Sequence, residues 1–78
     1  MLLLKLINET DSTVVYNYFP EQKEEFGTVI LDKKTGEIID VEISSNDLHK
    51  RYMHHAVSKV CQFFENGVYK KEEIVAWY

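Results

Sequence analysis

Three histidines and one cysteine are the side chains of this sequence best suited to catalysis or metal binding, but their spacing supports neither. His49, His54 and His55 contain no pair at positions i and i+4, the spacing that places two zinc ligands on one helix face. His54 and Cys61 would be about 10 Å apart along a helix, too far for a nucleophile and its base. We expect solvated or packed histidines and a Cys61 that behaves as a small hydrophobe. A site shared across a dimer is the alternative.

Carboxylates form the other candidates. Glu21, Glu24 and Glu25 lie in one charged segment and could bind a cation or a basic protein, although a solvated loop is the simpler interpretation. Asp40 and Glu42 share one face of a predicted strand and could act as an acid and a base. Charged residues on an edge strand also prevent edge-to-edge aggregation, and we favour this structural role.

The composition excludes several functional classes. The chain has three glycines and no glycine-rich loop, so it lacks a phosphate-binding motif and we expect no cofactor. Nine basic residues face thirteen acidic ones, for a net charge of -4. The basic residues do not cluster, and this argues against a nucleic-acid binder. A length of 78 residues indicates one domain, residues 1–78, and a hydrophobic fraction of 45% is typical of a globular protein.

The N-terminal segment and the single cysteine bear on location. The apolar run at residues 1–7 contains Lys5 and is too short for a transmembrane helix. Polar residues 8–11 follow it where a signal peptide would have a cleavage site. One cysteine cannot form an internal disulfide, which is natural in a reducing compartment. We therefore expect a cytoplasmic protein without a membrane segment.

The first half of the chain predicts four strands in two hairpins. Residues 2–8 and 13–19 are rich in aliphatic, β-branched and aromatic side chains, and Pro20 ends the second segment. Residues 26–32 and 37–43 form the second hairpin, whose turn contains Gly36 at a position that favours a positive φ. The predicted architecture is an antiparallel meander.

The second half predicts one amphipathic helix and a closing strand. Apolar residues recur at helical spacing over residues 48–65, polar residues 44–47 offer N-caps, and Gly67 is a helix stop. Residues 73–78 are rich in strand formers. They are predicted to lie antiparallel to the first strand; pairing parallel to the fourth strand and a final helical turn are the alternatives. Trp77 and Tyr78 either close the core or form a recognition tail. The predicted fold class is α+β, with the order ββββαβ.

Alternation along the strands separates two faces. The face predicted to lie under the helix meets Met53, Ala56, Val57, Val60 and Phe64. It contains Leu2, Leu4, Leu6, Val14, Tyr16, Tyr18, Val29, Leu31, Ile39, Val41 and Ile43. The opposite face mixes charged residues such as Glu9 with large hydrophobic ones that one helix cannot cover. These hydrophobic residues are the candidate interaction face: Leu3, Ile7, Val15, Phe19, Phe26, Ile30 and Ile38.

Three functional hypotheses follow from this pattern. The first is a non-enzymatic protein-interaction module that forms a homodimer, or binds another protein, through the uncovered face. The second is an acidic inhibitor or immunity-like protein that masks a basic partner, because of the net charge and the glutamates of residues 21–25. The third is a small enzyme whose site is assembled across a dimer from His54, Cys61, Asp40 or Glu42.

Overall fold

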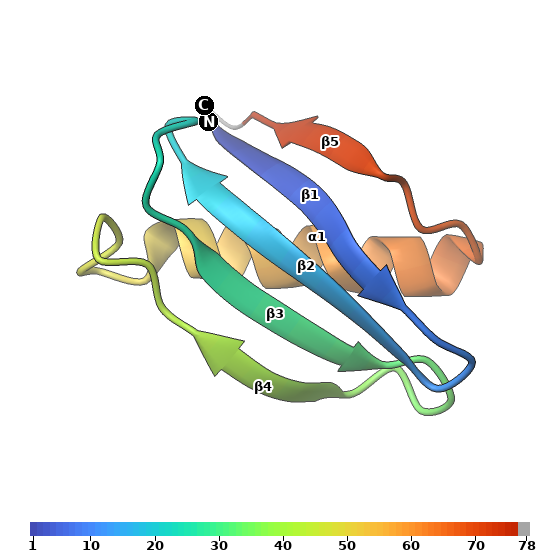
Figure 1. Cartoon of the computed structure of the whole chain (residues 1–78). Helices are drawn as coiled ribbons and strands as arrows, with labels where there is room; N and C mark the ends of the chain where they lie inside the picture. The colour runs from blue at the N-terminus through green and yellow to red at the C-terminus, as the bar shows by residue number, and fades with distance from the viewer. Residues whose placement is uncertain (77–78) are drawn as a thin grey trace.

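The structure is a computed structural model that describes residues 1–76, and within them the chain forms five strands and one helix (Figure 1). The strands are β1 (Leu2–Glu9), β2 (Thr13–Pro20), β3 (Gly27–Asp32), β4 (Ile38–Glu42) and β5 (Glu72–Val75), and the helix is α1 (Arg51–Asn66). All neighbouring strands are antiparallel, in the order β4-β3-β2-β1-β5. The predicted α+β class and the pairing of the last strand with β1 are confirmed. Trp77 and Tyr78 lie outside the described residues.

Helix α1 runs across one face of the sheet, which is the covered face of the molecule (Figure 1). Its buried residues Ala56, Val60 and Phe63 pack on the strands. The Phe63 ring lies 5.5 Å from that of Tyr16, between centroids. The sequence predicted Phe64 at this place, but Phe64 is only partly buried. The strand side of the core is as predicted for seven residues: Leu2, Leu4, Val14, Tyr16, Tyr18, Val29 and Leu31.

The helix begins later than predicted and ends where predicted. Lys50 adopts a left-handed conformation with φ 60°, so residues 48–50 do not continue the helix and α1 starts at Arg51. Gly67, with φ 73°, ends it, and its N–H bonds to the Phe64 carbonyl. None of the helices in residues 1–76 is long and apolar enough to cross a membrane.

Two glycines are required for different reasons, one for its backbone conformation and one for the space beside it. Gly36 has φ 79° in the β3–β4 hairpin and donates to the Asp32 carbonyl at 2.8 Å, as the turn prediction requires. Gly27 is buried opposite Tyr18 on β2. A Cβ at Gly27 would overlap the Tyr18 ring and the Glu42 carbonyl. The absence of a side chain at Gly27 therefore leaves room for the Tyr18 ring against the strand.

A bulge in β4 corrects the predicted faces of two residues. Leu31 pairs with Ile38 and Ile30 pairs with Asp40, so Ile39 is an extra residue. Ile38, predicted on the uncovered face, therefore packs against the core. Ile39, predicted under the helix, is 55% exposed. Strict alternation fails here because a bulge reverses the faces of all residues on one side of it.

A second irregularity lies in β1. Leu6 pairs with Tyr16 and Asn8 pairs with Val15, which leaves Ile7 as the extra residue, 55% exposed. Beyond it Glu9 pairs with Val14 and so lies on the covered side of the sheet, not on the opposite side as predicted. At this end Glu9 accepts a hydrogen bond from Lys33 at 2.8 Å.

Candidate interaction surface

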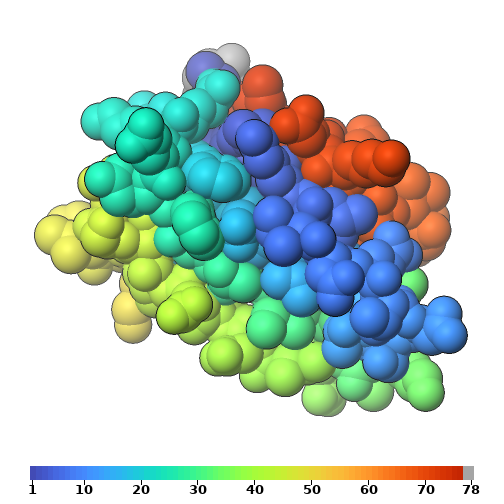
Figure 2. All heavy atoms as spheres, viewed as in Figure 1, coloured from blue at the N-terminus to red at the C-terminus, as the bar shows by residue number. Residues whose placement is uncertain are grey.

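The sheet face opposite α1 is the open face, and no other segment of residues 1–76 crosses it. Figure 2 views this side: the strands occupy the middle of the view, and the yellow and orange of α1 appear only at its margins. Neither the charged loop at residues 21–25 nor β5 covers it, because β5 joins the sheet as an edge strand. Its side chains form three rows that cross several strands, followed by the pair of Thr13 on β2 and Asp32 on β3.

One row is entirely hydrophobic and is called the apolar row. Leu3 on β1 pairs with Ile74 on β5 and with Phe19 on β2. Phe26, next to the start of β3, completes it, with its ring 5.4 Å from that of Phe19, between centroids. Ile74 is 55% and Phe26 51% exposed, whereas Leu3 and Phe19 are half-buried between them. The row thus presents to solvent four contiguous hydrophobic side chains, three from strands β5, β1 and β2 and one from the residue before β3.

The next row is polar and is called the polar row. The register places Glu72, Lys5, Asn17, Thr28 and Glu42 side by side across all five strands. Lys5 Nζ lies 3.8 Å from a Glu72 carboxylate oxygen and 5.6 Å from the centroid of the Phe19 ring. The Thr28 hydroxyl donates to Asn17 Oδ1 at 3.0 Å. This row therefore neutralises most of its own charge and leaves Glu42 at the β4 edge.

The third row, the distal row, is mixed. It consists of Asn8, Val15, Ile30 and Asp40, in cross-strand register. Only Val15 and Ile30 are hydrophobic, and both are half-buried. The seven residues predicted as one interaction face are therefore divided. Leu3, Phe19 and Phe26 belong to the apolar row, Val15 and Ile30 to the distal row, Ile7 to the β1 bulge, and Ile38 to the core.

Ile74 is the member of the apolar row that sequence reasoning missed. It lies in the segment predicted as a fifth strand, and the signal for it was the predicted pairing of that strand with β1. Ile74, Leu3, Glu72 and Glu73 line a shallow hollow of about 430 Å³ at this end of the sheet. A smaller hollow lies near the opposite edge, between Thr28, Ile30, Asp40 and Glu42.

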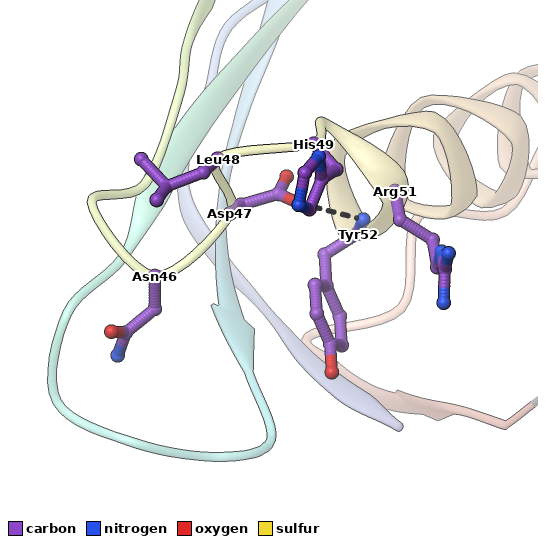
Figure 3. A pocket seen from close by; sticks show the side chains of 6 residues that line it. All are labelled: Asn46, Asp47, Leu48, His49, Arg51 and Tyr52. Carbon is purple, nitrogen blue, oxygen red and sulfur yellow. Dashed lines mark hydrogen bonds between the residues drawn. The ribbon is translucent and has the colours of Figure 1, made fainter.

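A second candidate site, at the start of α1, is occupied by structural hydrogen bonds. Asp47 is only 3% exposed, and its carboxylate accepts the backbone N–H groups of Tyr52 at 3.0 Å and Met53 at 2.8 Å (Figure 3). The Tyr18 hydroxyl donates to Asp47 at 3.1 Å and accepts the Ser44 N–H at 3.0 Å. Burial is the main cause that raises the pKa of Tyr18 to about 12. Asp47 was a predicted cap, but its bond to Tyr18 was not predicted.

In the hollow beside Asp47 the carboxylate is already engaged in structural hydrogen bonds. The hollow measures about 140 Å³ and is lined by Asn46, Asp47, Leu48, His49, Arg51 and Tyr52 (Figure 3). Both Asp47 oxygens already accept bonds from donors that hold the helix start, which is a capping role.

The three histidines and Cys61 differ in their exposure. His49 and His54 are exposed and His55 is half-buried. Cys61 is partly buried against the core, and this burial raises the pKa of its thiol. Among residues 1–76 no three His, Cys, Asp or Glu side chains come together as a metal site.

The candidate carboxylates serve local contacts. Glu21 accepts the amino group of Met1 at 2.7 Å, and this bond holds the pKa of its carboxyl below its usual value. Glu25 accepts a hydrogen bond from the side-chain amide of Asn46 at 3.1 Å. Asp40 and Glu42 lie in adjacent rows at the exposed β4 edge, consistent with protection of that edge.

Comparisons of the chain with known protein families, with curated proteins and with solved structures give no match. The functional argument therefore depends on the open face itself.

Proposed function

We propose that this protein is a non-enzymatic interaction module that associates with a second copy of itself through the open face. The observation that carries the proposal is the apolar row, in which Phe26 and Ile74 are each more than half exposed beside Leu3 and Phe19. Four adjacent hydrophobic side chains on an uncovered face gain free energy when a partner removes them from water.

The size of the face favours a partner that covers most of it. Strands spaced ~4.8 Å apart and rising ~3.3 Å per residue give this five-stranded face a projected area of roughly 500 Å², whereas a standard interface buries about 800 Å² of accessible surface per partner. The apolar row alone is too small for such an interface. A second copy provides a sheet of the same dimensions, and aligned sheets pack face to face at ~10 Å in β-sandwiches.

The measurement that tests the proposal is the mass in solution by sedimentation or light scattering at micromolar concentration. We expect a dimer of the 9.2 kDa chain. Phe26→Asp should convert it to a monomer, because a buried unpaired carboxylate is costly. Leu48→Asp is the matched control, since Leu48 is 86% exposed but lies outside the open face. A native chain that is monomeric throughout, or a dimer that survives Phe26→Asp, would contradict the proposal.

A second proposal is binding to a basic protein, as an acidic inhibitor would bind. Its support is the acidic β4 edge, where Asp40, Glu42 and the preceding Glu37 are all exposed. Such binding would weaken steeply as salt is raised, because exposed charges are screened. A complex that is insensitive to salt, or that survives Asp40→Asn together with Glu42→Gln, would exclude this surface.

A further inference from the structure

We infer that the second copy docks about a two-fold axis that runs along the strands between β1 and β2, so that Phe26 of each copy enters the hollow beside Ile74 of the other. This inference rests on the proposed self-association and specifies its geometry. Phe26 and the hollow lie in the same row, separated by β2 and β1. They are therefore a half-exposed ring and a shallow hollow that cannot meet within one chain.

The direction of the axis follows from the three rows. An axis along the strands places each row opposite the same row of the second copy, so that hydrophobic side chains meet hydrophobic ones. An axis across the strands, through the polar row, would oppose Lys5 to Lys5 and Glu72 to Glu72. Like charges opposed in a desolvated interface cost several kcal/mol, so this arrangement is disfavoured. An axis across the strands through the apolar row would oppose Phe26 to Phe26 and leave the hollow unfilled.

The position of the axis follows from the hollow and from the carboxylates. Between β1 and β2, the axis places Phe26 opposite Ile74 and Phe19 opposite Leu3, so all four residues of the apolar row are covered. Centred over β2, it would oppose Glu72 to Glu42. Between β2 and β3, it would leave Ile74 and its hollow outside the contact.

With the same axis the charged residues Lys5 and Glu72 of the polar row face uncharged residues of the second copy. The Lys5–Glu72 ion pair of one copy then faces the hydrogen-bonded pair of Asn17 and Thr28 in the other. Polar groups that enter an interface already paired lose less on desolvation than unpaired ones do. Strand β4, with its bulge and its carboxylates, falls at the rim, where exposed polar groups are normal.

The hollow can accommodate the ring. It is a shallow depression of about 430 Å³ that is open to solvent, not an enclosed cavity. Leu3 and Ile74 supply its hydrophobic side and Glu72 and Glu73 its polar side. Aromatic side chains that are buried at the centre of an interface commonly dominate its energetics.

The decisive experiment uses two variants that should form a dimer only when mixed. Phe26→Lys and Ile74→Glu change side chains that are more than half exposed in the monomer. Each variant alone should raise the dissociation constant roughly 100-fold or more, because it places an unpaired charge in both symmetric contacts. An equimolar mixture should recover the dimeric mass, since the lysine introduced in one variant then meets the glutamate introduced in the other. Unchanged circular dichroism of each variant confirms that it is folded.

The outcomes separate this geometry from the proposed function. A native chain that is monomeric at all concentrations overturns both. A native dimer that each single variant dissociates, with no recovery on mixing, retains self-association through the open face but overturns the axis.

The unmodified protein provides an independent check by isotope-filtered NMR on mixed labelled and unlabelled chains. Phe26 and Ile74 are three strand spacings apart in one chain, about 14 Å, so a cross peak between them arises only between chains. Its presence is expected, and its absence in an established dimer rules out the contact.

Discussion

The covered and open faces of the same sheet are built on different principles. On the covered face hydrophobic residues follow one another along β2 and β3, and the buried hydroxyls of Tyr16 and Tyr18 each have a hydrogen-bond partner. On the open face a polar row separates the apolar row from the distal row. The covered face thus supplies folding free energy, whereas the open face concentrates its hydrophobic surface at one end, where a partner can use it.

The largest difference in unfolding free energy is expected between alanine substitutions of two adjacent leucines that lie on opposite faces. Leu4 is fully buried and Leu3 is half-buried. Leu4→Ala should lower the unfolding free energy by about 2–5 kcal/mol, because it leaves a cavity in the core. Leu3→Ala should lower it by less than about 1 kcal/mol in the monomer. Denaturant unfolding in the Phe26→Lys background, where association is removed, measures both, and equal losses would refute the assignment of the faces.

A smaller difference in unfolding free energy is expected between alanine substitutions of two aspartates. Asp47→Ala should cost about 2–3 kcal/mol, because it removes the cap of α1 and leaves the Tyr18 hydroxyl without its acceptor. Asp40→Ala, at an exposed position of the open face, should change the unfolding free energy by less than about 0.5 kcal/mol. Thermal unfolding of the two variants checks the difference. A mild effect of Asp47→Ala would show that Asp47 does not anchor the helix start.

Alkaline pH should weaken the covered face selectively. Burial raises the pKa of Tyr18 from 10.0 in the unfolded chain to about 12 in the folded protein, and it raises the pKa of Tyr16 further. Folding therefore favours the protonated phenols, so stability is fully present below pH 10 and is lost as pH rises above it. Unfolding measured from neutral to strongly alkaline pH should show this decline, with a shallower slope in Tyr18→Phe. An unchanged slope would mean that ionisation of the Tyr18 phenol does not contribute to the decline in stability.

The smallest effect is expected in the polar row. Thr28→Val removes the 3.0 Å hydrogen bond to Asn17, but water can replace it on an exposed face, so the unfolding free energy of the monomer should change by about 0.5 kcal/mol or less. If the dimer has the inferred axis, the same substitution should weaken association measurably, because the amide of Asn17 then becomes buried without its partner. Sedimentation of Thr28→Val against the native chain makes the comparison.

Prediction from sequence succeeded where a local rule decides the structure. Gly67 ended the helix and Gly36 formed the turn because few other residues adopt a positive φ at low cost. It failed at Ile38 and Ile39, since the bulge between them is defined only by pairing with β3. It also failed at Lys50, a non-glycine residue with φ 60°, whose conformation is not encoded by residue type. The capping by Asp47 was accessible to prediction, but its bond to Tyr18 spans 29 residues.

By itself the sequence determined the number and order of the elements and the existence of two chemically different faces, whereas the pairing of β5 with β1 was one of three alternatives that the structure decided. These properties follow from periodicity, turn residues and the reach of one helix, all of which act locally. Only the tertiary structure decided which hydrophobic residues lie side by side across the strands. The two bulges and the register bring Ile74, Leu3, Phe19 and Phe26 into one row and send Ile38 into the core. Neighbours across strands are set by pairing between distant segments, so alternation along each strand does not define them.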